Sequence, residues 1–465
     1  MDSARLTRTL ADGLAEIPLL DAHTHLDAAH LAARGLDDVL LYHMAVSDLS
    51  SAGCPSRARL PEDPTREEAH ARIAEALPFV AAIRNTSGYW GIRIILRELY
   101  GIDPPTDEAG WWRVDGAIRE RSEDGAWARE VLNKTGIRRS CTELWRGRDG
   151  QADDILQFAL EWAFFARGQT GMNDIVLYEL ERTRTQDRPA APLPVTLGGT
   201  RPPAERPVVT VEDVYEAVEH YVAAIPYDKV LSTAQHISTD IRLRPVTEGD
   251  MASALARRGE ASLADRDVYA SFVLEAFLDA LERGKHRILF QFSIGAEPLP
   301  FETGSKLRQS TVFDVAELVA RHPGIGFQAL LASEHANQAI CTLVRELPNL
   351  SVAGFWWHNL FPGIIRKVMH DRLDMVALNR QVGFFSDAYC VEWAFAKATI
   401  IRRQLADVLA DKVGQGQYNV EEALDIAREI LFESPQCLNG MTPRVPDQQL
   451  ASDHEAATAD GSPSR

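Results

Sequence analysis

Short apolar runs alternate with longer amphipathic stretches through the second half of the chain. This alternation is typical of strand–helix units, in which each buried strand of a parallel sheet is followed by a helix that covers it. The apolar runs predict strands at residues 287–293, 326–331, 350–355 and 382–387. The amphipathic stretches predict helices at residues 268–283, 312–321, 337–347, 362–379, 391–412 and 420–432.

The first half of the chain is predicted to be mainly helical. Residues 17–20 form a short apolar run that we expect to be a buried strand, and a second strand is expected at 136–141. Helices are expected at residues 2–16, 36–49, 67–100 with an interruption near 85–88, after Trp111-Trp112, at 153–185 and at 211–224. Proline-rich segments at 53–65 and 185–207 are predicted to be loops, and the second is the candidate for a mobile lid.

The consecutive strand–helix units favour a (β/α)8 TIM barrel with helical insertions. An open doubly wound sheet is the alternative, but the chain has no Gly-x-Gly-x-x-Gly or Walker-type loop to accompany it. We predict a single barrel domain over residues 1–440, with helical insertions around 56–130 and 145–235. Residues 441–465 are expected to form a disordered C-terminal tail because apolar residues are scarce there.

Composition narrows the partners that this chain can have. The formal net charge of −18 over 465 residues argues against nucleic acid or an anionic membrane as the main partner. Five widely spaced cysteines without a Cys-x-x-Cys motif indicate reduced thiols, and no apolar run approaches the roughly 18 residues of a membrane span. We therefore expect a cytoplasmic protein with a small-molecule substrate. A homo-oligomer is a further expectation, since helices covering such barrels often pair subunits.

His23 and His25 are the most informative pair of residues in the sequence, because they follow directly on the first predicted strand. Residues two apart on a strand point to the same side, and neutral imidazoles are good metal ligands. Asp387 ends the last predicted strand, and parallel strands of a barrel converge at one rim. The three residues together predict a site for one divalent cation, most simply Zn²⁺, with Mn²⁺ or Fe²⁺ as alternatives. Asp387 can equally cap the following helix, and the two roles are compatible.

Other candidate site residues follow neighbouring strands. Trp356 and Trp357 could wall a pocket or simply pack between loops, and His358 beside them could be a ligand, a proton donor or a surface histidine. His335 follows another strand and is a second catalytic candidate. Arg244, in an alternating apolar and basic segment, could bind a substrate carboxylate through its guanidinium group, or could be solvated like most arginines.

Several motifs resemble those of the uronate (glucuronate) isomerases, a divergent branch of the amidohydrolase superfamily. The resemblance extends from the first strand to about residue 440 and rests on the sequence Leu20-Asp21-Ala22-His23-Thr24-His25-Leu26, on Ile294-Gly295-Ala296, on Gly354-Phe355-Trp356-Trp357, on Phe385-Ser386-Asp387 and on the helical run ending near Asn439. It implies a distorted (β/α)8 barrel and one divalent metal held by residues resembling His23, His25 and Asp387. It also implies metal-supported proton transfer in the aldose–ketose interconversion of a hexuronate, with His43 near a family active-site histidine and with Trp357 and its neighbour resembling the pocket tryptophans.

The chain also departs from the family pattern. Ser293 stands where a histidine is usual, and Glu297-Pro298 follows where the family has positive charge. Met44 replaces a tyrosine after His43, although Tyr42 precedes it, and Tyr389 replaces an arginine after Asp387. We include Tyr42 and Tyr389 among the candidate substrate-binding residues.

Three functional hypotheses follow. The first is a uronate isomerase-like enzyme that acts on a sugar acid or a related small polar substrate by metal-assisted proton transfer, in which Asp387, or a group that it orients, moves the proton between adjacent carbons. The second is an amidohydrolase-type hydrolase or lyase that uses a metal-activated water, with His335 or His358 polarising the leaving group, or oxidative chemistry at the same His-His-Asp metal. The third is a binding or scaffold protein that has lost activity.

Overall fold

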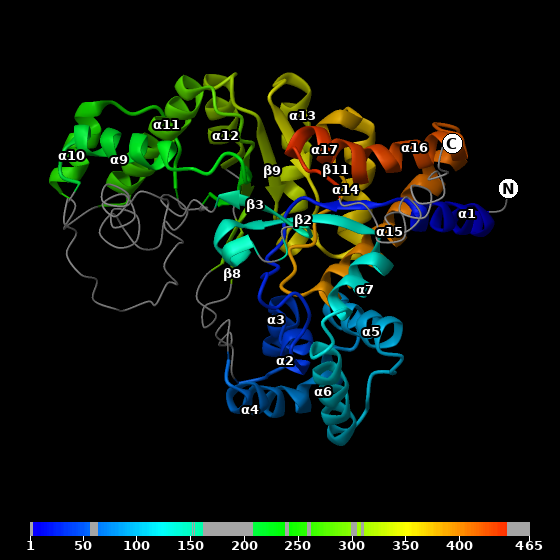
Figure 1. The fold of residues 1–465 in the computed structure, drawn as a ribbon. Helices are drawn as coiled ribbons and strands as arrows, with labels where there is room; N and C mark the ends of the chain where they lie inside the picture. The colour runs from blue at the N-terminus through cyan, green and yellow to red at the C-terminus, as the bar shows by residue number, and fades with distance from the viewer. Residues whose placement is uncertain are drawn as a thin grey trace, which may run out of the picture.

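Two parallel sheets curl around a common interior in the computed structural model (Figure 1). The structure describes residues 3–55, 64–150, 152, 154–160, 208–237, 241–257, 262–298, 305–307 and 311–443. The first sheet has the strand order β1 (Leu19–Asp21), β2 (Ile137–Glu143), β3 (Leu156–Leu160) and β4 (Val230–Thr233). The second has the order β11 (Gln381–Val382), β10 (Leu350–Ala353), β9 (Phe327–Leu331), β6 (Phe290–Ile294) and β5 (Gln235–His236).

The edges of the two sheets meet at two seams. At one seam β4 continues into β5, and a parallel bridge joins Ser232 to Leu289. At the other, the His25 amide donates to the Ala388 carbonyl at 2.9 Å, and the Asp387 amide donates to the His23 carbonyl at 3.0 Å. All of the strands that pair within the two sheets are parallel. The fold is the predicted distorted (β/α)8 barrel.

Helices surround the barrel in groups. Figure 1 shows helices α2 to α7 gathered on one side of the sheets and α9 to α11 on another. The bounds in chain order are α1 (Ser3–Glu16), α2 (Leu36–Leu40), α3 (His43–Ser51), α4 (Arg66–Ala76), α5 (Ser87–Leu99), α6 (Glu108–Ser122), α7 (Trp127–Thr135), α9 (Val211–Ala223), α10 (Glu248–Ala256), α11 (Leu263–Gly284), α12 (Thr311–Arg321), α13 (Asn337–Glu346), α14 (Pro362–Met375), α15 (Val391–Gly414), α16 (Val420–Arg428) and α17 (Ser434–Asn439).

Shorter elements complete the chain. The 3-10 turns are η1 (Leu77–Ile83), η2 (Leu144–Gly150), η4 (Glu334–Ala336), η5 (Trp357–Asn359) and η6 (Leu378–Arg380), η7 (Glu429–Glu433) is a π-helix, and β7 (Ala296–Pro298) pairs antiparallel with β8 (Ser305–Leu307). Among the helices of the described residues, none has the length and apolar character needed to cross a lipid bilayer.

The barrel interior contains a cluster of apolar side chains and a network of hydrogen-bonded side-chain amides. The apolar cluster includes Leu20, Ala22, Cys141, Ala159, Leu330, Ala353, Val382 and Phe385. Next to it, the Gln291 side-chain amide donates to Gln328 Oε1 at 2.9 Å, and Gln328 exchanges hydrogen bonds with Asn439 of α17 at 2.9 and 3.2 Å. These amides satisfy one another, so the interior accommodates polar atoms without leaving them unpaired.

Most predicted elements are confirmed to within a few residues, but three differ. The helix expected at 36–49 is divided into α2 and α3, because Tyr42 is extended and its hydroxyl donates to the Asp387 carbonyl at 2.8 Å. The helix expected at 153–185 is wrong over 156–160, where β3 pairs with β2 and β4. The strand expected at 382–387 ends at Val382, and the residues beyond it form the rim. The predicted lid at 185–207 lies outside the described residues, as does most of the predicted C-terminal tail.

Asp21, at the end of β1, connects the barrel seam to the last strand. The Ser386 amide donates to Asp21 Oδ1 at 2.7 Å, and the Ser386 hydroxyl oxygen lies within hydrogen-bond distance of Oδ2, at 2.6 Å. The Asp21 side chain is fully buried, and burial raises the pKa of its carboxyl group from 3.8 to about 7 despite these hydrogen bonds. A carboxylate at this position therefore costs free energy when it is charged.

The folded protein consequently retains the Asp21 proton between about pH 4 and pH 7, where the unfolded chain has lost it. Ionisation of Asp21 in the unfolded chain therefore lowers the free energy of unfolding as the pH rises through this window, by up to about 4 kcal/mol. Asparagine does not titrate, so we predict that the free energy of unfolding of Asp21→Asn rises steadily relative to that of the wild type from pH 4 to pH 8. Urea denaturation at a series of pH values measures the difference. The exposed Asp103→Asn is the control, expected to run parallel to the wild type, and a parallel curve for Asp21→Asn would contradict the prediction.

Candidate metal centre

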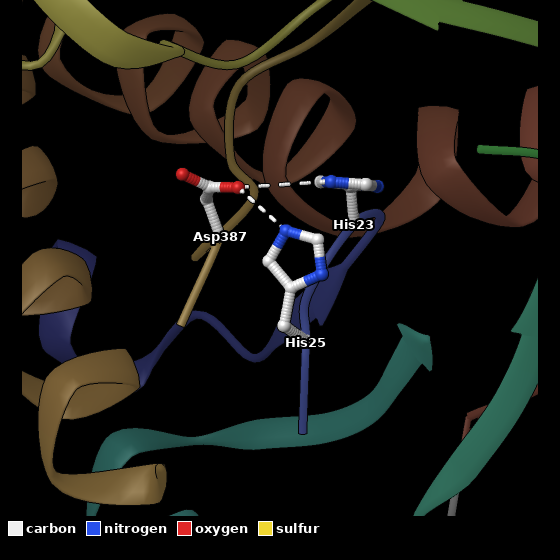
Figure 2. A group of neighbouring side chains, drawn as sticks. All are labelled: His23, His25 and Asp387. Atoms are coloured by element: carbon white, nitrogen blue, oxygen red, sulfur yellow. Dashed lines mark ion pairs between the residues drawn. The ribbon is translucent and has the colours of Figure 1, made fainter. Parts of the chain in front are cut away.

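Two imidazoles and one carboxylate converge at the carboxyl ends of β1 and β11. His25 Nε2 lies 3.2 Å from Asp387 Oδ1, and His23 Nε2 lies 3.7 Å from the same oxygen. Figure 2 shows both rings turned towards the carboxylate. One ligand atom from each of the three residues lies within 4.8 Å of the others. Ligands about 2.0–2.2 Å from a tetrahedral zinc ion stand roughly 3.3–3.6 Å apart, so the donor set and its spacing fit a shared divalent cation.

The backbone at the seam sets this geometry. His23 and His25 stand on either side of Thr24, whose hydroxyl donates to the Ala388 carbonyl at 2.9 Å and accepts from Ser386 at 2.9 Å. Thr24 therefore points towards the last strand, and the two histidines point away from it into the rim. Asp387 has a φ of 50°, which is unusual for a residue with a side chain and costs about 1–3 kcal/mol. The seam hydrogen bonds hold it in this conformation.

Glu143, at the end of β2, orients His25. Its Oε1 lies 2.5 Å from His25 Nδ1, and Arg146 Nε donates to its other oxygen at 2.9 Å. A carboxylate on one ring nitrogen places the proton there and leaves the other nitrogen, here Nε2, to face a metal ion. The sequence prediction missed Glu143 because it ended the second strand at residue 141. Extending that strand to its observed end would have put this carboxylate at the rim.

Lys397, in the second turn of α15, lies next to Asp387. Its ammonium group donates to the Asp387 carbonyl at 3.1 Å and to the Tyr42 hydroxyl, and it lies 3.9 Å from Asp387 Oδ2. Burial lowers the pKa of Lys397 to about 8. Nothing in the sequence marked this lysine, since a charged residue in a helix is usually solvated.

The protonation states suit metal binding. Burial, helped by the neighbouring His25, lowers the pKa of His23 to about 4, so His23 is a neutral ligand at pH 7. Burial alone would raise the pKa of Asp387, but the hydrogen bond from His25 and the charge of Lys397 keep it well below its ordinary value. Burial also opposes a charge on His25, yet Glu143 raises the pKa of that ring above 6.5. Binding of a cation at His25 therefore releases a proton.

Aromatic rings wall the space beside the cluster. Tyr389 stacks on His25 with ring centres 4.8 Å apart, and Trp357 stacks on His43 at 5.8 Å. His43, the first residue of α3, directs Nε2 to within 3.9 Å of Asp387 Oδ2, the oxygen on the other side of the carboxylate from the two ligand imidazoles. Tyr42 packs against His43 with ring centres 4.1 Å apart. The structure thus brings the predicted residues Tyr42, His43, Trp357 and Tyr389 to the cluster.

The Gly-x-Trp-Trp segment adopts a strained path after β10. Gly354 has a φ of 42°, and a Cβ atom there would lie 2.2 Å from the Phe385 ring, so only glycine fits. Trp357 has a φ of 52°. Backbone strain of this kind is concentrated at functional sites. Trp356, the other predicted tryptophan, is buried with its ring 5.8 Å from that of Trp357.

Three predicted residues lie outside the cluster of described ligand atoms. His335 is exposed in η4, where its amide donates to Ser333. His358 is half-buried in η5, with its ring 6.0 Å from Trp357, and burial lowers its pKa. Arg244 is exposed, and its amide donates to Ser271 of α11. Catalytic roles for the two histidines and substrate binding by Arg244 therefore stay predictions.

Comparisons with known proteins find similarity to uronate isomerases in a part of the sequence and in the fold. No protein-family model matches the chain. In sequence, 99 residues are 24% identical to the uronate isomerases of Thermotoga sp. (strain RQ2) and Thermotoga maritima, a match that spans 21% of this chain and 22% of each relative. The similarity in sequence is therefore local.

The similarity in structure extends over nearly the whole chain. The glucuronate isomerase of Caulobacter crescentus matches with a TM-score of 0.76 at 15% identity, over 96% of this chain and 95% of that one. The uronate isomerase of Thermotoga maritima matches with a TM-score of 0.74 at 14% identity, over 94% and 97%. The fold is that of the uronate isomerases. A candidate metal-dependent hydrolase from Lactobacillus casei also matches, with a TM-score of 0.56 at 12% identity, over 93% and 97%.

We predict that Glu143→Gln weakens Zn²⁺ binding at the rim by about 10–100-fold, because the glutamine no longer supplies the negative charge that favours the required ring orientation. Competition titration of the purified protein against a chromophoric chelator measures the affinity. Glu98→Gln, an exposed carboxylate paired with Arg403, is the control and keeps the wild-type affinity. Equal affinity of Glu143→Gln and the wild type would show that the carboxylate does not support the ligand.

Proposed function

We propose that this protein is a mononuclear, divalent-metal-dependent enzyme of uronate isomerase type that moves a proton between adjacent carbons of a sugar acid or a related small polar substrate. The observation that carries the proposal is the position of His23, His25 and Asp387 at the rim of a uronate isomerase fold. Chemistry in such barrels is found at the carboxyl ends of the strands. The proposed cation is Zn²⁺, held by these three side chains.

A bound cation would polarise a substrate carbonyl and so acidify the neighbouring C–H bond. Asp387 is proposed to receive that proton on Oδ2, the oxygen turned away from the imidazoles, and to return it to the adjacent carbon. His43 faces the same oxygen at 3.9 Å and is suited to move the second proton between the two substrate oxygens. Lys397, 3.9 Å from Oδ2, favours the ionised carboxylate that begins the cycle.

The aromatic walls are proposed to bind the substrate. Trp357, Tyr389 and Tyr42 exclude water from one side of the cluster, which strengthens polar contacts inside it. The proposed partner is therefore a small molecule, bound by a protein that can form a homo-oligomer. All five cysteines are free thiols, which favours the reducing cytoplasm as its compartment.

Hydrolysis or lyase chemistry by a metal-activated water is the second candidate. The observation that favours it is the charge balance beside the cluster: Arg146 is paired with Glu143, and Lys397 with Asp387. Tyr389 stands where the family pattern has an arginine, and Ser293 bonds His236 at 3.2 Å where that pattern has a histidine. Few cationic side chains beside the cluster are therefore left to bind the carboxylate of a uronate, which an isomerase of uronates would need.

Proton NMR in deuterium oxide distinguishes the two candidates. Metal-loaded protein is incubated with glucuronate and galacturonate, and in parallel with lactones, amides and aromatic acids. Deuterium entering the carbon next to the carbonyl of a uronate supports the isomerase. Hydrolysis of a lactone or amide without such exchange supports the second candidate and contradicts the first.

On the substrate that turns over, Asp387→Asn is expected to lower kcat/KM by about 10²–10⁴-fold, because the amide cannot accept the proton and is a weaker ligand. Steady-state kinetics by the same NMR assay measure the loss. Asp407→Asn, an exposed carboxylate of α15 paired with Arg366, serves as the control and keeps wild-type kinetics. Wild-type turnover by Asp387→Asn would remove this carboxylate from the mechanism.

A further inference from the structure

A second histidine–carboxylate cluster lies away from the rim. It is formed by α11 and by His322, which directly follows α12. Because α12 leads into β9, His322 precedes the amino end of that strand, whereas the His23–His25–Asp387 cluster lies at the carboxyl ends. The two clusters are therefore at opposite ends of the barrel.

The Nδ1 atom of His322 is buried but makes no hydrogen bond. The side chain is only 2–3% exposed. That nitrogen faces Glu282 Oε2 at 3.5 Å and Asp279 Oδ1 at 3.8 Å, both too distant for a hydrogen bond. A buried polar atom without a hydrogen bond destabilises the folded protein. A positively charged occupant bound to Nδ1 and to both carboxylates would remove this destabilisation.

The other ring nitrogen is already committed. His322 Nε2 lies 2.7 Å from Glu275 Oε2, and Arg321 pairs with the other oxygen of the same carboxylate. A carboxylate on Nε2 fixes the ring so that Nδ1 faces Asp279 and Glu282. Burial opposes a charge on His322, but Glu275 and these two carboxylates raise its pKa, so a cation that binds Nδ1 would displace a proton. Glu282 is itself positioned, because the Gly324 amide donates to its Oε1 at 2.8 Å and leaves Oε2 facing the ring.

The rim cluster is built in the same way. There, Glu143 contacts one nitrogen of His25, Arg146 holds Glu143, and the second nitrogen faces Asp387. In both places an arginine-held carboxylate orients an imidazole towards further carboxylate oxygens. We propose that Asp279, Glu282 and His322 form a second divalent-cation site, most suited to Zn²⁺, independent of the rim site.

The ligand spacing and the exposure of the cluster support this assignment. The separations of 3.5 and 3.8 Å are near the roughly 3.3–3.6 Å expected between two ligands of one tetrahedral zinc ion. Asp279 is 54% exposed, so a cation can enter from solvent and keep a water ligand. The cation would tie two turns of α11 to the connection between α12 and β9. Its role is therefore to stabilise the amino-terminal end of the barrel.

Equilibrium dialysis of the full chain against buffered Zn²⁺, with metal content measured by mass spectrometry, tests the proposal. The wild type is expected to bind two equivalents of Zn²⁺ and Asp279→Asn/Glu282→Gln one, because the amides keep the shape of the carboxylates without their charge. Glu317→Gln, an exposed α12 residue outside the cluster, is the matched control and retains two. Equal zinc content of the double variant and the wild type would overturn the site.

The rim variant His23→Ala separates this site from the proposed function. It is expected to retain one equivalent of Zn²⁺, and added Zn²⁺ is expected to raise its Tm, a shift that disappears when Asp279→Asn/Glu282→Gln is added. If only the site at His322 binds Zn²⁺ and the rim does not, the wild type binds one equivalent of Zn²⁺ and Asp279→Asn/Glu282→Gln binds none. Absence of both the retained zinc and the Tm shift in His23→Ala would instead show that His322 is a protonated imidazole among carboxylates.

Discussion

Closure of the barrel between β1 and the segment after β11 is the constraint on which the candidate centre depends. Main-chain hydrogen bonds between His23 and Asp387, and between His25 and Ala388, join segments more than 350 residues apart in the chain. The same bonds that join the segments following β1 and β11 place two imidazoles beside one carboxylate. Barrel formation and assembly of the centre are therefore one event. A change that opens this seam would separate the three side chains without altering any of them.

Buried charge next to the seam is arranged in opposed pairs. Asp387 faces Lys397, and Glu143 faces Arg146, so neither carboxylate is left without a neighbouring cation in a low-dielectric environment. These pairs also set the protonation states of the groups around them. The rim holds the neutral imidazole of His23, the ionised Asp387 and the His25 ring, which loses a proton when a cation binds. Tyr389 and Trp357 lie beside it, stacked on His25 and His43.

The three proposed ligands of the candidate centre could be predicted from the sequence because strand geometry fixes where they lie. The period-two geometry of a strand puts His23 and His25 on one face, and parallel strands bring Asp387 to the same rim. Glu143 was missed because a strand end is poorly marked by an apolar pattern. Lys397 was missed because the pattern of a helix does not distinguish a buried lysine from a solvated one.

The errors in the fold have similar causes. The short apolar run of β3 fits the period of a helix as well as that of a strand, and only its pairing with β2 and β4 decides between them. The second histidine–carboxylate cluster also could not be predicted from the sequence. Glu275, Asp279 and Glu282 recur on one helix face, as many solvated acidic residues do. Only the tertiary fold places His322 against them.

The most direct test of the account is a crystal structure of Zn²⁺-loaded protein with anomalous diffraction recorded at the zinc absorption edge. The account predicts an anomalous peak about 2.0–2.2 Å from Nε2 of His23, Nε2 of His25 and an oxygen of Asp387. Saturating zinc without a peak among these three side chains would contradict it.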